Sequence, residues 1–257
     1  MVIDQIVALK PDILCLQELD RYPWVKDKLS EFGYTVSVFH KRPGDKDDGC
    51  GTFLNPQMFQ IDNSWFVEFK DKTKRIAQFV KVSFVKARSK KAKENSLLIC
   101  NTHLYWDTDQ PNLQLSQLEL VLQNLTPYVD QCFAIIVCGD FNSSPEQTPF
   151  LYFSGAEIPK QHQQRFSKFI QQRTQYPKFS SAFQNYENTG AHPPFTAYQD
   201  KWSGCVDYIW FNTQVVDTLG VIRTNSLPSK SEVTKEIALP NSSFPSDHLP
   251  LFALFGC

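Results

Sequence analysis

Short apolar runs in this chain repeatedly stop at a polar or acidic side chain. The segment Ile135–Asn142 begins with four apolar residues and ends in Gly-Asp-Phe-Asn. Ile13–Glu18 and Leu98–His103 also begin with an apolar run and end in polar residues. Nearer the C-terminus, Asp207 opens one apolar run and Ser246-Asp247-His248 precedes another. Because such short apolar runs are typical of buried strands, the pattern predicts an α/β domain whose polar groups gather at sheet edges.

The remaining apolar periodicity predicts further strands and several helices. Helices are expected over residues 2–9, 23–32 and 112–125, with 161–173 a possible surface helix, and strands over 34–39, 51–54, 65–69, 78–84, 195–198, 206–211 and 249–255. No internal repeat or interdomain linker is evident. Many short strands with a few interspersed helices predict one domain over residues 1–257, with two packed sheets flanked by helices.

Charge and cysteine content restrict the classes of function. The net charge of -1 argues against a protein that grips long duplex nucleic acid, because such proteins carry a basic excess. A nucleic-acid substrate would instead be short, single-stranded, or held by a metal and a few side chains. The seven cysteines include no CxxC pair, which predicts buried free thiols and a reducing compartment. No segment is long enough to span a membrane, and the first residues do not resemble a signal peptide.

One basic run, Lys86–Lys93, allows two interpretations. It could contact nucleic acid, or it could be the solvated loop of a hairpin between the strands predicted on either side. The second interpretation is favoured, because short runs of like charge are usually solvated.

The polar residues at the strand ends each have a structural explanation when taken alone. Glu18 could cap a turn, and Asp140 with Asn142 could form an Asx-turn. His103 could be a hydrogen-bonded core histidine, and Ser246-Asp247-His248 a helix-cap sequence. Taken together, several carboxylates and an Asn amide suit a hard cation such as Mg²⁺, which takes few protein ligands and keeps several waters. The cysteines and histidines lack the spacing of a zinc site.

Five motifs in order carry a resemblance to a known family. They are LCLQE (14–18), NTHLYWD (101–107), CGDFNS (138–143), GCVDYIWF (204–211) and PSDH (245–248). They resemble motifs of the endonuclease/exonuclease/phosphatase superfamily, and within it the CCR4–nocturnin–Angel group of RNA 3′ exonucleases, most of all its 2′,5′-phosphodiesterase branch. The resemblance implies a DNase I-like fold, a four-layer α-β-β-α sandwich of two packed mixed sheets.

The resemblance also implies roles for the acidic residues and the amide. Glu18 would be the main ligand of Mg²⁺, with Mn²⁺ as an alternative ion, and Asp247 a second carboxylate on the metal side. Asp140 would position or deprotonate the attacking water. Asn142 would hydrogen-bond the scissile phosphate.

Four further residues acquire roles from the same resemblance. His248 would stabilise the pentacovalent phosphorane or transfer a proton, with Asp207 orienting its imidazole. His103 would contact the phosphate. Trp202 lies where relatives place an aromatic side chain that stacks on a base, and ordinary packing of Trp202 is the competing explanation.

Two departures from the family pattern stand out. Relatives begin with an Asn-bearing strand upstream of the strand that ends in Glu18, whereas Met1 lies only 17 residues before Glu18 here. We therefore expect a domain that is truncated at its N-terminus and lacks the first strand. Asp107-Thr108 stands where close relatives have a proline.

The function implied is that of a magnesium-dependent phosphodiesterase, a 3′ exoribonuclease that hydrolyses oligoadenylate to 5′-AMP. The substrate would be 2′,5′-linked oligoadenylate or the poly(A) tail of single-stranded RNA. An alternative is a catalytically weak RNA-binding or scaffold protein, because of the missing strand. Other substrates of the superfamily are disfavoured by the histidine of NTHLYW. No membrane and no obligate protein partner are expected, and the location would be intracellular, in the mitochondrial matrix or the cytosol.

Overall fold

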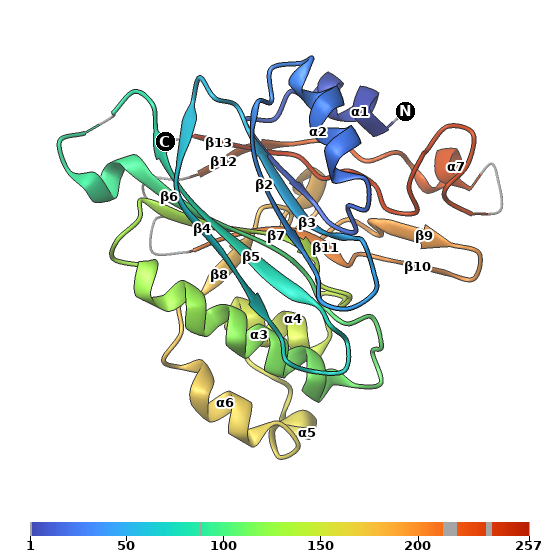
Figure 1. The fold of residues 1–257 in the computed structure, drawn as a ribbon. Helices are drawn as coiled ribbons and strands as arrows, with labels where there is room; N and C mark the ends of the chain where they lie inside the picture. The colour runs from blue at the N-terminus through green and yellow to red at the C-terminus, as the bar shows by residue number, and fades with distance from the viewer. Residues whose placement is uncertain (1, 88, 213–219, 235–237, 257) are drawn as a thin grey trace.

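The larger of two central β layers is a six-stranded mixed sheet. The computed structural model describes residues 2–87, 89–212, 220–234 and 238–256 (Figure 1). In spatial order the sheet contains β4 (Phe59–Glu68), β5 (Ile76–Phe84), β6 (Ser96–His103), β7 (Ala134–Asp140), β11 (Asp207–Asn212) and β8 (Phe179–Ser181). β6 and β7 are parallel, and the other neighbouring pairs are antiparallel. The parallel pair is important because it places two strand ends with polar residues side by side.

The second β layer is divided between two smaller sheets. One contains β1 (Ile13–Leu16), β3 (Gly49–Leu54) and β2 (Val36–Lys41) in that spatial order, and the other pairs β12 (Gly220–Thr224) with β13 (Ala253–Gly256). Both pack on the same face of the larger sheet. Cys15 of β1 and Leu54 of β3 belong to an apolar cluster with Ile99 of β6. In the same cluster, Phe255 of β13 packs on Phe211 of β11, with ring centroids 5.6 Å apart.

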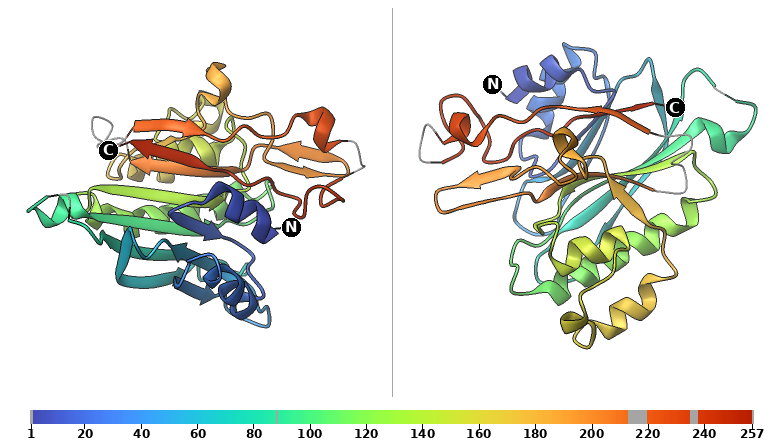
Figure 2. Two further views of the ribbon diagram at one scale, coloured as in Figure 1. Left: turned by 90° about the horizontal axis from the view of Figure 1, so that it is seen from above. Right: turned by 180° about the vertical axis from the view of Figure 1, so that it is seen from behind.

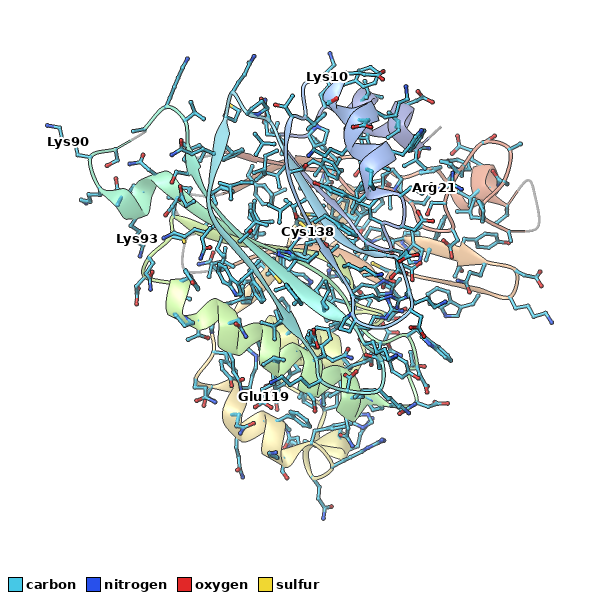
Figure 3. The ribbon with its side chains drawn as sticks, in the orientation of Figure 1. Lys10, Arg21, Lys90, Lys93, Glu119 and Cys138 are labelled. Carbon is cyan, nitrogen blue, oxygen red and sulfur yellow. The ribbon has the colours of Figure 1, made fainter. Side chains whose placement is uncertain are left out.

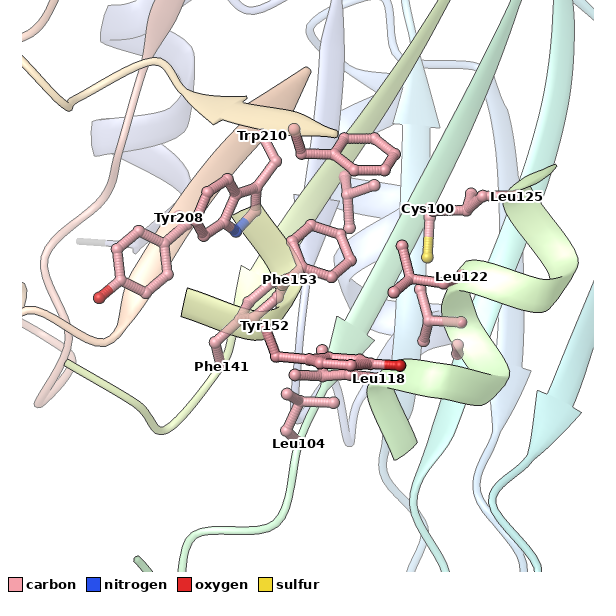
Figure 4. Close-up of a cluster of buried hydrophobic side chains, with 14 of the residues drawn as sticks. Cys100, Leu104, Leu118, Leu122, Leu125, Phe141, Tyr152, Phe153, Tyr208 and Trp210 are labelled. Carbon is pink, nitrogen blue, oxygen red and sulfur yellow. The ribbon is translucent and has the colours of Figure 1, made fainter. Parts of the chain in front are cut away.

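Helices cover the outer faces of both layers. α3 (Pro111–Leu125), α4 (Thr148–Ser154), α5 (Lys160–Gln163) and α6 (Ser167–Arg173) gather on one side of the larger sheet, as Figure 1 and the right view of Figure 2 show. Leu118 and Leu122 of α3 meet Cys100 of β6, Phe153 of α4 and Trp210 of β11 in the main core (Figure 4). These leucines lie on one face of α3 because apolar residues recur there every three or four positions.

The opposite outer face is covered by α1 (Val2–Leu9) and α2 (Tyr22–Ser30). Ile6 of α1 and Leu29 of α2 pack with Phe53 of β3 in a separate apolar cluster. The predicted arrangement, two packed sheets between layers of helices, is therefore confirmed. The remaining elements are the hairpin of β9 (Ala197–Gln199) and β10 (Trp202–Gly204), the short helix α7 (Lys230–Val233), and 3-10 turns over Ala92–Asn95, Thr126–Tyr128 and Tyr186–Asn188.

Two expected elements differ from the structure at the ends of the chain. β1 is half-buried rather than buried on both faces, because it forms one edge of its three-stranded sheet. The strand expected over 249–255 begins only at Ala253. Pro250 has no N–H to donate, and the N–H of Leu249 bonds the carbonyl of Thr196 at 2.7 Å instead.

The stretch expected as one surface helix over 161–173 forms two short helices, α5 and α6. Phe166, between them, is 2% exposed and belongs to the main core. The segment is therefore anchored by an apolar side chain rather than lying free on the surface.

The described residues of the basic run, 86, 87 and 89–93, form a mostly exposed connection at the end of the sheet remote from the polar strand ends. β5 and β6 pair as an antiparallel hairpin, and Lys90 and Lys93 project from its connection (Figure 3). The run precedes β6, whereas the polar group His103 ends it, so about 25 Å of strand separates the two. The structure thus favours the hairpin interpretation over a nucleic-acid contact at the strand ends.

Six cysteines in the described segments are free thiols, as predicted, and four of them are buried. Cys257 lies outside the described residues. Among the residues that the structure places, no helix is both long and apolar enough to cross a bilayer.

Candidate active site

Three polar residues predicted from strand ends lie abreast on the larger sheet. His103 pairs with Asp140 in the parallel register of β6 and β7, and Asp207 pairs with Asp140 in the antiparallel register of β11 and β7. Nε2 of His103 is 3.3 Å from Oδ2 of Asp140. Gly139 permits this close approach, since a Cβ there would lie 1.9 Å from the carbonyl oxygen of Thr102. The sheet register thus brings together groups that the sequence separates by up to 104 residues, the interval from His103 to Asp207.

His248 is held against this row by Asp207. Its Nδ1 is 2.8 Å from Oδ2 of Asp207, and its Nε2 is 4.0 Å from Oδ2 of Asp140. Burial alone would lower the pKa of His248, but the hydrogen bond and charge of Asp207, together with Asp140, raise it to about 9. The imidazole is therefore protonated at neutral pH, with Nε2–H directed toward Asp140.

Thr196 completes the support of Asp207. Its hydroxyl donates to Oδ2 of Asp207 at 2.7 Å and accepts the backbone N–H groups of Val206 and Asp207. Ala197, the next residue, forms an isolated β-bridge with His248, so the backbone beside Thr196 is also joined to that of His248. Thr196 could not be recognised from the sequence, because one threonine before a short strand is common.

Asp140 is almost fully buried, with 6% of its surface exposed. Burial and the nearby Asp207 carboxylate raise the pKa of Asp140 to about 8, although His248 and the backbone N–H of Asn142 oppose the shift. A carboxyl whose pKa lies near neutrality suits a proton acceptor, because general bases work best near the operating pH.

Asn142 sits in the left-handed region at φ 47°, where Asn is tolerated better than most residues. Its backbone N–H donates to Oδ1 of Asp140 at 2.8 Å, which confirms the predicted Asx-turn. Its amide Nδ2 donates to the carbonyl of Leu104 at 3.1 Å and to Oδ2 of Asp140 at 3.2 Å. Gln114 of α3 then joins the carbonyls of Asn142 and Tyr105, which fixes the loop after β6 to the loop after β7.

Glu18 follows β1 and approaches the row from the second β layer. Its side chain is 60% exposed, and its Oε1 is 3.7 Å from both Nδ1 of His103 and Nη1 of Arg75. Burial, with Arg75 and His248 nearby, holds the pKa of His103 well below its usual value, so His103 is neutral. Within the described residues the Glu18 carboxylate accepts no hydrogen bond, and its lone pairs stay available.

Buried Asn101 ties the strand before Glu18 to the larger sheet. Its Nδ2 donates to the carbonyls of Leu16 and Gly51, each at 3.1 Å, and its Oδ1 accepts Nε2 of Gln17 at 2.7 Å. One side chain of β6 therefore fixes the end of β1 beside His103.

Asp247 and Trp202 lie at the border of this cluster. Oδ2 of Asp247 accepts Nε2 of Gln199 at 3.2 Å, which holds the carboxylate toward the β9–β10 hairpin. Trp202 begins β10 and is 45% exposed. In the described part of the chain, neither forms a hydrogen bond or ion pair with Glu18 or Asp140. The structure thus joins six of the eight predicted residues directly and leaves these two at the margin.

The Glu18 carboxylate, which accepts no hydrogen bond within the described residues, is one group that could hold a cation. Asp140, Asp207 and His248 also offer three ligand atoms within 4.8 Å of one another. However, Oδ2 of Asp207 already bonds His248 and Thr196, and His248 carries a proton that a cation would have to displace. The exposed Glu18 carboxylate needs no such displacement, and hard oxygen donors of this kind suit Mg²⁺.

The elevated pKa of His248 gives an expected pH dependence of stability. A histidine whose folded pKa is about 9 stabilises the fold fully below pH 6.5, and this contribution is lost as the pH rises through 9. We expect the free energy of unfolding in EDTA to fall by on the order of 3 kcal/mol between pH 6.5 and 9.5. Asp140 acts in the same direction, because its pKa is also raised.

Urea denaturation across this pH range measures the effect. The His248→Gln variant should show a clearly smaller fall, since it cannot take up the proton. An equal fall in both proteins would contradict the assignment of the proton to His248.

Comparisons with known proteins show a family match that covers most of the chain. A model described as the Endonuclease/Exonuclease/phosphatase family matches residues 1–248. 2′,5′-phosphodiesterase 12 of Mus musculus is 27% identical over 276 residues, which cover 96% of this chain and 44% of that protein. The CCR4-Not complex 3′-5′-exoribonuclease subunit Ccr4 of Debaryomyces hansenii is 25% identical, over 98% of this chain and 34% of that protein. The chain thus spans less than half the length of these two curated relatives.

A solved structure shows the same fold. The crystal structure of ANGEL2, described as a 2′,3′-cyclic phosphatase in complex with adenosine-2′,3′-vanadate, superposes with a TM-score of 0.78 at 21% identity. The superposition covers 99% of this chain and 84% of that one.

Proposed function

The chain belongs to the endonuclease/exonuclease/phosphatase family, and from that premise we propose that its site hydrolyses phosphodiester bonds. The substrate would be oligoadenylate, as 2′,5′-linked chains or the poly(A) tails of RNA, and the product 5′-AMP. The names of two relatives, a 2′,5′-phosphodiesterase and a 3′-5′-exoribonuclease, support this class of substrate.

The observation that carries the proposal is geometric: His248, held by Asp207 at 2.8 Å, places its Nε2 4.0 Å from the buried carboxylate of Asp140. Asp140 would accept the proton of the attacking water. His248, held by Asp207, would donate Nε2–H to the phosphoryl oxygens as negative charge grows there. Fixed donors beside the reacting phosphorus lower the barrier because they need no reorganisation.

Asn142 and His103 are the proposed phosphate contacts. Both hydrogens of the Asn142 amide are engaged, and the longer bond, to Oδ2 of Asp140 at 3.2 Å, is the one that a phosphate oxygen would replace. His103 would contact the phosphate as a neutral imidazole, since its pKa is low.

The cation proposed for the site is Mg²⁺, with Mn²⁺ as the alternative. Glu18 would hold it from the second β layer, and Asp247 would contribute a further carboxylate from the border of the site. Members of this family generally depend on a divalent metal. When bound, such an ion neutralises charge on the phosphoryl and leaving oxygens.

Substrate binding would use the surface around the hairpin β9–β10. The half-exposed Trp202 offers a face for a base, and such stacking contributes about 1–3 kcal/mol per base in single-stranded nucleic acids. Six described free thiols support an intracellular location, and we keep the mitochondrial matrix and the cytosol as the proposed compartments.

Incubation with both linkage types tests the proposal. We expect Mg²⁺-dependent release of 5′-AMP, by chromatography, from the 3′ end of 2′,5′- or 3′,5′-linked adenylate, and none in EDTA. Comparison of the two linkages decides between the two substrates. Tight RNA binding without product in Mg²⁺ or Mn²⁺ would contradict hydrolysis and support the binding-protein alternative.

A further inference from the structure

Arg75 is a largely buried cation beside the site that the sequence did not single out. It directly precedes β5, and its side chain is 12% exposed. It lines a small cavity together with Glu18, Arg42, Asp48 and His103. An arginine before an apolar strand has no distinctive sequence signal, because many strands begin beside a solvated cation.

Within the described part of the chain, the guanidinium of Arg75 has one carboxylate at ion-pair distance and donates no hydrogen bond. Its nearest carboxylate oxygen, Oε1 of Glu18, lies 3.7 Å away, which is too far for a hydrogen bond. Among the described residues, no side chain or carbonyl accepts a hydrogen bond from its five N–H donors. A largely buried guanidinium whose donors make no hydrogen bond within the described chain can take up the oxygens of a ligand without breaking a hydrogen bond of the protein.

Arg42, the other arginine of the cavity, shows the contrast. Its Nη2 donates to Oδ2 of Asp48 at 2.7 Å, and its Nε contacts Oδ1 of the same carboxylate. Arg42 is therefore neutralised by a two-point ion pair, whereas Arg75 faces the site with its donors unused.

The position of Arg75 directs its charge toward the proposed reaction centre. Ala77 of β5 pairs with Thr102 of β6 in an antiparallel register, so the residues before Ala77 lie at the same end of the sheet as His103. The positive charge of Arg75 contributes to lowering the pKa of His103 and opposes the rise in the pKa of Asp140. Its field therefore reaches one proposed phosphate contact, His103, and the proposed proton acceptor, Asp140.

We propose that Arg75 binds the non-bridging oxygens of the substrate phosphate, as a phosphate-binding residue of the site. The inference rests on the function proposed above. A guanidinium presents parallel donors that match two phosphate oxygens, which a lysine cannot do. A cation on Glu18 would occupy the carboxylate oxygen that Arg75 faces, and the N–H donors of the guanidinium would then be free to bind the phosphate.

A purely structural role is the competing explanation. Arg75 would then serve only as the counter-ion of Glu18, and its loss would matter only while Glu18 is charged. The two roles differ in what happens when Glu18 is neutralised, so a double-mutant cycle separates them.

The experiment measures binding without turnover. Fluorescein-labelled oligoadenylate and 5′-AMP are titrated in EDTA, by anisotropy and calorimetry respectively, at several salt concentrations. Arg75→Gln should weaken both ligands about 10- to 100-fold, because charge-assisted hydrogen bonds to phosphate are lost. The slope of log K against log salt for the oligonucleotide should fall by about 0.7. Arg75→Lys should restore the salt slope but not the full affinity.

Two controls make the result specific. Lys74→Gln removes one charge from the adjacent exposed residue and should leave the affinity for 5′-AMP unchanged. In a Glu18→Gln background, Arg75→Gln should still weaken binding about 10- to 100-fold. The melting temperature of this double variant should equal or exceed that of the wild type, because it no longer holds a largely buried cation without a charged partner.

The other outcomes separate failure of the inference from failure of the proposed function. Binding by Arg75→Gln equal to that of Lys74→Gln, or an effect that vanishes beside Glu18→Gln, leaves Arg75 a structural counter-ion while hydrolysis stands. Arginine-dependent binding of 5′-AMP without binding of oligoadenylate keeps Arg75 and rejects the proposed substrate. A wild-type protein that binds neither probe rejects both.

Discussion

Asp140→Asn should lower kcat/KM for oligoadenylate hydrolysis by about 10³-fold, within the range of about 10²–10⁴ expected for loss of a general base. The amide keeps the size of the side chain, and its oxygen can still accept the backbone N–H of Asn142. What it loses is the capacity to take a proton from water. Steady-state release of 5′-AMP in saturating Mg²⁺ measures the effect.

The stability of the same variant separates lost chemistry from lost structure. The pKa of Asp140 is raised to about 8, so its contribution to stability is present at low pH and is lost as the pH rises through 8. Asp140→Asn cannot ionise, so we expect its free energy of unfolding to fall less than that of the wild type as the pH rises through 8. Asp109→Asn, on an exposed loop, is the control and should keep full activity. Activity of Asp140→Asn above a tenth of wild type would contradict the role of Asp140.

Glu18→Gln should remove the response of the protein to Mg²⁺. A ligand at 100 times its Kd stabilises a fold by about 2.7 kcal/mol, which raises the melting temperature of a chain of this size by about 5–10 °C. We expect this rise in the wild type and none in the variant, together with a loss of activity of about 10³-fold. Differential scanning calorimetry with and without Mg²⁺ measures the shift independently of catalysis.

Glu31 provides a matched control for Glu18. Its side chain is 57% exposed, close to the 60% of Glu18, and it likewise faces a basic residue, Lys28. Glu31→Gln should retain both the shift and the activity. A Mg²⁺ shift that persists in Glu18→Gln but disappears in Asp207→Asn would move the cation to Asp140, Asp207 and His248.

The parts of the site that could be predicted from the sequence lie at the ends of long buried strands. Asp140 and His103 each follow an apolar run, and runs of this kind reveal both the strand and the position where its polar end begins. Asp207 was recognisable in the same way, because it opens the buried strand β11. These signals are local, so the chain order of the residues is enough to detect them.

The remaining features depend on contacts between distant segments. Three-residue strands such as β8 and β10 form because a neighbouring strand offers hydrogen bonds, and their own residues show no alternation. Arg75 and Thr196 are ordinary residues by type. Their roles become apparent only in the folded chain, where Arg75 lines the cavity beside Glu18 and the hydroxyl of Thr196 donates to Asp207.

The attachment of Glu18 to a small sheet has a consequence for motion. Glu18 follows a four-residue, half-buried edge strand, whereas Asp140 ends a strand in the middle of six. Amides of β1 should therefore exchange with deuterium sooner than those of β7, because opening the small sheet exposes less apolar surface. Such an opening must break the hydrogen bonds that the side chain of Asn101 donates to the carbonyls of Leu16 and Gly51. The side of the site proposed to hold the cation is thus expected to open locally at a lower free energy than the side formed by β7 and β11.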